Sequence, residues 1–73
     1  MDMTQEQQER KKNARKILNL PVAQRPDNVR YIPGTRLNFA FYEIIFDDVA
    51  VCFQYDGNRF YYLGEFHADP NQR

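Results

Sequence analysis

The chain has 73 residues, of which 42% are hydrophobic and 15% aromatic, and ten basic residues balance ten acidic ones. Residues 1–36 carry eight basic and four acidic residues, a net charge of +4, whereas residues 37–73 carry two and six, a net charge of −4. This length excludes a deep catalytic cavity, the single cysteine excludes an internal disulfide, and no apolar run approaches the ~20 residues of a membrane-spanning helix. We expect one cytoplasmic domain, with a bipolar field that orients it on a partner.

Residues 1–20 are predicted to form a basic helical arm. Thr4 and Gln7 have the spacing of a capping box and Pro21 cannot continue a helix, so a helix is expected over residues 4–20. Glu6 is placed to pair with Arg10 one turn later. Because apolar side chains occur only in the last turns, the C-terminal half should dock on the rest of the chain and the first two turns should fray.

Residues 21–36 form a connector rich in proline. Pro26 to Asn28 is typical of a turn, and Pro33-Gly34 fits the central pair of a type II turn. Between them, Val29–Ile32 is a candidate for a short edge strand, so the sheet could have three strands or four.

Residues 37–66 alternate between apolar and polar side chains with a period of two, which indicates β-strands. Asp47-Asp48 and Asp56-Gly57-Asn58 are the expected turns, and the second is the strongest hairpin signal in the chain. Residues 67–73 are a polar tail. The predicted fold is therefore α+β, with one N-terminal helix and a three- or four-stranded antiparallel β-meander in a single domain of residues 1–73.

The alternation leaves two questions about the sheet faces. In the first strand either a bulge shifts the register near Glu43, or both faces carry apolar side chains. The second option fits a sheet covered by the helix on one side and presenting Tyr42, Tyr61 and Leu63 on the other. In the last strand Phe60, Tyr62 and Phe66 are expected to face one way and Tyr61, Leu63 and Glu65 the other, with Gly64 marking a bulge.

The residues needed for catalysis are few. The chain has no serine, one histidine and one cysteine, and His67 lies far from Cys52 in the sequence. A Cys–His pair would need a third orienting group and a cleft, whereas a lone cysteine in a strand usually behaves as a small buried hydrophobe. Adjacent Asp47 and Asp48 are read as a hairpin turn instead of a metal site. We predict that the chain is not an enzyme and needs no cofactor or metal.

Two groups of side chains are candidate partner-binding surfaces. The first is the basic cluster of the arm, Arg10, Lys11, Lys12, Arg15 and Lys16. It could be a solvated helix face, a contact for an acidic protein, or a phosphate contact for nucleic acid, although no aromatic residue is interleaved for base stacking. The second is Tyr42 and Tyr61 with Arg59 and Glu65 at the rim, which suits a protein-binding hot spot, while core packing is the alternative.

The segments MDMTQEQQERKKNARKIL and YDGNRFYYLGEF resemble the small RNA-polymerase-binding regulators that lytic Xanthomonas bacteriophages use in host takeover. The resemblance implies that the chain binds bacterial RNA polymerase through the N-terminus of its largest subunit, inhibits transcription initiation and later acts in antitermination. We would then expect a monomer in the host cytoplasm that binds no specific nucleic acid alone. The alternative is a small nucleic-acid-binding protein whose basic helix contacts phosphates.

Overall fold

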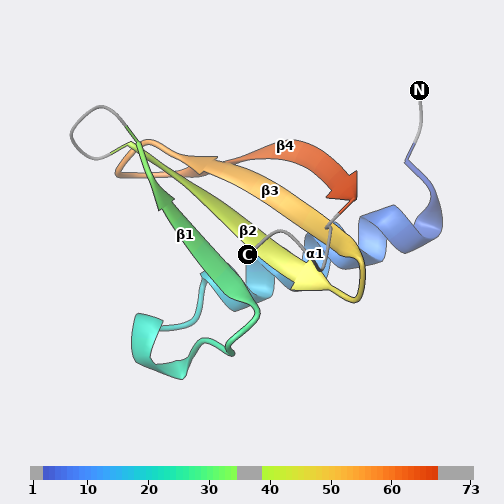
Figure 1. Cartoon of the computed structure of the whole chain (residues 1–73), viewed down its shortest axis with the longest axis horizontal. Coiled ribbons are helices and arrows are strands. Elements are labelled where there is room, and N and C mark those ends of the chain that lie inside the picture. The colour runs from blue at the N-terminus through green and yellow to red at the C-terminus, as the bar shows by residue number, and fades with distance from the viewer. Residues whose placement is uncertain (1–2, 35–38, 68–73) are drawn as a thin grey trace.

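The computed structural model describes residues 3–34 and 39–67, which form one helix packed on one sheet (Figure 1). The elements are α1 (Gln5–Leu18), a 3-10 turn η1 (Val22–Gln24), β1 (Val29–Pro33), β2 (Ala40–Phe46), β3 (Val49–Tyr55) and β4 (Phe60–His67). The strands are antiparallel in the order β1-β2-β3-β4. The predicted α+β meander is confirmed. It has four strands, because Val29–Ile32 belongs to the edge strand β1. No helix of the described residues is long and apolar enough to cross a membrane.

Helix α1 begins at the predicted capping box. The Thr4 hydroxyl accepts the Gln7 N–H at 3.1 Å, and the Gln7 side-chain oxygen accepts the Thr4 N–H at 2.9 Å. The helix ends at Leu18, earlier than expected, because Asn19 caps it before Pro21 is reached. Arg25 of the connector donates to the carbonyls of Leu18 and Leu20 at 2.8 and 3.1 Å, so its cation satisfies the negative end of the helix.

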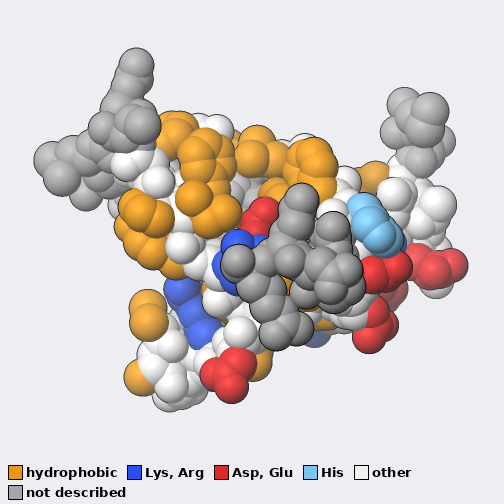
Figure 2. Space-filling view, in the orientation of Figure 1, with side chains coloured by type: hydrophobic (Ala, Val, Ile, Leu, Met, Phe, Trp, Pro, Cys, Tyr) orange, Lys and Arg blue, Asp and Glu red, His pale blue; other side chains and the backbone are white. Residues whose placement is uncertain are grey.

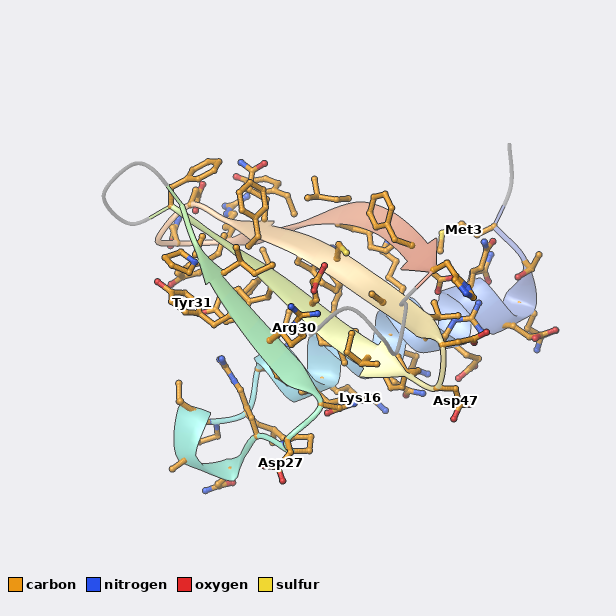
Figure 3. The ribbon with its side chains drawn as sticks, viewed as in Figure 1. Met3, Lys16, Asp27, Arg30, Tyr31 and Asp47 are labelled. Atoms are coloured by element: carbon orange, nitrogen blue, oxygen red, sulfur yellow. The ribbon has the colours of Figure 1, made fainter. Side chains whose placement is uncertain are left out.

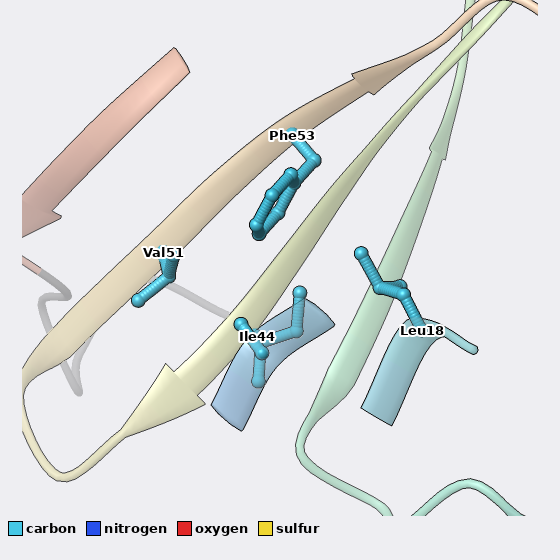
Figure 4. Packing of buried hydrophobic residues seen from close by; sticks show 5 residues of the cluster. Leu18, Ile44, Val51 and Phe53 are labelled. Carbon is cyan, nitrogen blue, oxygen red and sulfur yellow. The ribbon is translucent and has the colours of Figure 1, made fainter. Parts of the chain in front are cut away.

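The core lies between α1 and the two central strands. Ala14 and Leu18 of the helix pack on Ile44 of β2 and on Val51 and Phe53 of β3, all with at most 2% of their surface exposed (Figure 4). The predicted docking of the C-terminal half of the helix is therefore confirmed. The first two turns, which were expected to fray, are helical in the structure, and the Thr4–Gln7 capping box satisfies backbone N–H groups at their start.

Both predicted hairpin turns are present. Asp47 takes a positive φ of 54° between β2 and β3, and Gly57 takes φ of 95° between β3 and β4. The Asp56 carboxylate accepts the N–H groups of Asn58 and Arg59 at 2.8 Å each, and these bonds, that of Arg59 first, lower the pKa of Asp56. The predicted Pro33-Gly34 turn is different: Pro33 ends β1 and pairs with Ala40, and residues 35–38 of this connection lie outside the described residues.

The register answers both questions about the sheet faces. Strand β2 pairs without a shift along its whole length, so both of its faces are apolar and there is no bulge at Glu43. The irregularity lies in β4, where the pairing shifts between Cys52 and Phe53, and Gly64 has φ of 135°. The extra residue reverses the alternation beyond it, so Glu65 faces the helix and Phe66 faces away. The predicted faces of these two residues are therefore wrong.

Candidate functional site

The face of the sheet turned away from α1 carries a largely apolar surface, which we name the open face (Figure 2). Its members alternate with core residues along each strand. They are Arg30 and Ile32 of β1, Phe41, Glu43 and Ile45 of β2, Ala50, Cys52 and Gln54 of β3, and Tyr61, Leu63, Gly64 and Phe66 of β4. In Figure 2 hydrophobic side chains gather along the β4 side of this face, with acidic and basic atoms beside them.

The centre of the open face is polar and electrically balanced. Arg30 and Glu43 are opposite one another in the β1–β2 register and form an ion pair at 3.4 Å. The Cys52 thiol is buried beside Glu43, with Sγ 3.8 Å from the carboxylate oxygen. Burial first, and then the negative charge of Glu43, raise the pKa of Cys52 from 9.0 to about 11. The thiol is therefore protonated at neutral pH, and the register places His67 on the opposite face of the sheet.

The flanks of the open face are apolar and exposed. On β4 the exposed fractions are 46% for Tyr61, 47% for Leu63 and 57% for Phe66, and Ile32 of β1 is 38% exposed. Side chains of this size normally gain free energy by leaving water, so several of them on one face mark a surface suited to a partner. The Tyr61 hydroxyl donates to Asp56 at 3.2 Å, which orients its ring beside the β3–β4 turn.

Tyr42 does not belong to this surface, although Tyr42 and Tyr61 were expected on one face. Tyr42 packs on the helix side, with its ring 5.3 Å from that of Tyr31 and 5.4 Å from that of Phe60. Arg25 lies over the same ring at 5.7 Å. The expected rim is also divided, because Glu65 faces the helix while Arg59 is exposed in the β3–β4 turn.

Three members of the basic cluster contact the sheet. Arg10 forms a two-pronged ion pair with Glu65 at 2.7 and 2.8 Å instead of the expected pair with Glu6, and this bond raises the pKa of Arg10. Lys11 lies over the Tyr62 ring at 4.6 Å. Arg15 lies over the Phe53 ring at 5.2 Å, and its guanidinium donates to the Phe60 carbonyl at 3.5 Å. These cations stabilise the contact between helix and sheet.

Lys12 and Lys16 remain exposed one turn apart on the outer face of α1 (Figure 3 labels Lys16). They line a shallow basic groove together with Met3, Gln8, Lys11, Arg15 and Asn19. Four of the five predicted cluster residues therefore line one groove, and the fifth, Arg10, is paired with Glu65. We name the exposed pair Lys12 and Lys16 the basic strip. Among the described residues no group of three or more His, Cys, Asp or Glu side chains could hold a metal ion.

Sequence reasoning missed Phe66 and Ile32 as surface residues. The sequence contained a signal for Ile32, because Phe41 and Ile45 indicated an apolar second face on β2. In the structure Ile32 pairs with Phe41 on that face. Phe66 was placed on the wrong face, because the bulge expected at Gly64 was not applied to the residues that follow it. Comparisons with protein families, curated proteins and solved structures found no significant match to this chain.

Proposed function

We propose that this chain is a stoichiometric protein-binding regulator that binds bacterial RNA polymerase and inhibits transcription initiation, with antitermination as a further effect. The resemblance of its N-terminal and β3–β4 segments to phage host-takeover regulators supports the choice of polymerase. The observation that carries the proposal of protein binding is the open face, where exposed apolar side chains of β1 and β4 flank the Arg30–Glu43 ion pair.

This arrangement has the composition of a protein interface. Large apolar side chains supply the free energy of association when they leave water, and a charged pair at the centre favours a partner with complementary polar groups. The tyrosine ring of Tyr61 adds a rigid contact area at low entropic cost. The basic strip of Lys12 and Lys16 lies on the helix, away from this face, where it serves to attract an acidic partner during encounter.

The proposal is tested by equilibrium binding of the purified chain to purified bacterial RNA polymerase, followed by promoter-dependent transcription and terminator read-through in vitro. Leu63→Thr removes an apolar side chain from the open face, and Leu20→Thr removes one of similar exposure beyond the helix end. We expect Leu63→Thr to weaken binding and inhibition about tenfold, because burying a leucine contributes roughly 1.5–3 kcal/mol, while Leu20→Thr leaves both unchanged.

Two results would contradict this proposal. Failure of the native chain to bind polymerase would exclude polymerase as the partner. Equal binding by both leucine variants would exclude the open face as the contact surface. Tight binding to free duplex DNA, lost on neutralising Lys12 and Lys16, would favour the nucleic-acid alternative.

A further inference from the structure

The free edge of β1 lies on the far side of the sheet from β4 and borders the open face, to which β1 contributes Arg30 and Ile32 (Figure 1). Four of its five residues, Arg30 to Pro33, are exposed, as they would not be in a central strand. An exposed edge presents unpaired backbone donors and acceptors that another extended segment can use.

The hydrogen bonds that flank β1 show which backbone groups point outward. The Ile45 N–H donates to the Asn28 carbonyl at 2.9 Å, and the Gly34 N–H donates to the Phe39 carbonyl at 2.8 Å. The backbone N–H and C=O groups of the even-numbered residues in this segment therefore point towards β2 in the antiparallel ladder. The N–H and C=O groups of Val29 and Tyr31 point to the free edge, where no hydrogen bond to them occurs within the described residues.

A groove runs beside the same two residues. Val29 and Tyr31 line it from β1, and the Tyr42 ring contributes a wall. The connector contributes Val22, Arg25, Pro26 and Asp27. Its volume is about 570 Å³, and Val22 and Tyr31 are 76% and 59% exposed. Side chains of a strand added to β1 would alternate between this groove and the Arg30 side of the sheet.

A second copy of this chain fits the edge poorly. Pairing centred on Tyr31 places Val29 opposite Pro33, which has no N–H, so a carbonyl of each Val29 is left without a donor. Pairing centred on Arg30 satisfies the backbone but places two guanidinium groups directly opposite one another, which is unfavourable. These two registers, which overlap most of β1, thus carry a penalty that a different segment avoids.

Arg30 also indicates the chemistry of that segment. Its side chain is 57% exposed and retains donors beyond its single 3.4 Å contact with Glu43. Arg30 and Tyr31 leave β1 in different directions in Figure 3, so one strand would meet the Arg30 cation on one side and the Tyr31 groove on the other. The groove also contains Arg25, whose guanidinium is already bound to the Leu18 and Leu20 carbonyls.

We propose that the β1 edge binds an extended segment of another protein by strand addition, with apolar side chains in the Tyr31 groove alternating with a carboxylate at Arg30. This site shares the Arg30 side chain with the open face, whereas its backbone groups and the Tyr31 groove lie outside that face. It does not depend on the proposed polymerase partner.

The probe is a blocked heptapeptide of alternating valine and glutamate, with its valine–lysine counterpart as the charge control. Binding is measured by titration, together with amide hydrogen exchange of the native chain. We expect the glutamate peptide to slow exchange at Val29 and Tyr31 and the lysine peptide to bind more weakly. Arg30→Gln should abolish that preference.

Tyr31→Pro removes the outward N–H without breaking a bond to β2, and Tyr31→Ala is its control for loss of the side chain. The proline variant should bind the glutamate peptide about tenfold more weakly than the alanine variant. Unchanged exchange at Val29 and Tyr31 with peptide in excess would overturn the proposal, and so would equal binding by two folded Tyr31 variants. A native dimer in sedimentation that Tyr31→Pro dissociates would also overturn it, by making a second copy the occupant.

Discussion

Two adjacent isoleucines on β2 allow a sharp comparison of the two sheet faces. Ile44 is fully buried under α1, whereas Ile45 is half-buried on the open face. Ile44→Val and Ile45→Val each remove one methyl group, and valine and isoleucine have similar strand propensities, so the backbone contribution cancels. The difference between the two variants therefore reports only how each side chain is packed.

The expected loss is larger for Ile44. Removing a buried methyl group takes away its transfer free energy and leaves a small cavity, so Ile44→Val should lower the free energy of unfolding by about 1 kcal/mol. At Ile45 less area is removed from contact and water fills the space, so the loss should be about 0.5 kcal/mol or less. A domain of this length has roughly 4–11 kcal/mol in total, so the larger loss is easily measured.

The assay is urea unfolding followed by far-ultraviolet circular dichroism, with thermal unfolding as a second measurement. Ile44→Val should lower Tm by about 4–8 °C and Ile45→Val by less than half of that. An equal or larger loss for Ile45→Val would refute the reasoning, because the open face would then be packed as tightly as the core and could not serve as a free surface.

Three further predictions concern single features. Gly57→Val should lower stability by more than ~1 kcal/mol in urea, because a β-branched residue resists φ of 95°, whereas Gly57→Asn should cost less. Cys52→Ala should leave polymerase inhibition intact, because Cys52 is buried beneath the open face and offers a partner little surface. The loss of stability in this variant should be constant below pH 9 and shrink towards pH 11, since the unfolded thiol ionises before the folded one. A loss independent of pH would contradict this. Reversing Lys12 and Lys16 to Glu should slow association with polymerase at low salt without changing Tm, and equal rates would assign these lysines to a solvated face.

The local elements followed from the sequence because their causes are local. The capping box joins Thr4 and Gln7 within one turn, and Gly57 supplies a positive φ inside its own loop. The alternation over 37–66 needed only the period of a strand, so the helix, the meander and its turns could be predicted without knowledge of distant contacts. The apolar second face of β2 was also visible as one of two alternatives.

Only the tertiary structure decided which surfaces those elements present. Gly64 indicated a bulge in the sequence, but only the pairing with β3 shows that the bulge places Glu65 on the helix side and Phe66 on the open face. Arg10 then finds that carboxylate 55 positions away in the chain, where a contact with low exposure to water is stronger than one with Glu6 on the helix surface. The partner of a long charged side chain, and the face on which a strand residue lies, depend on neighbours that are distant in sequence. A local sequence pattern does not indicate which neighbours those are.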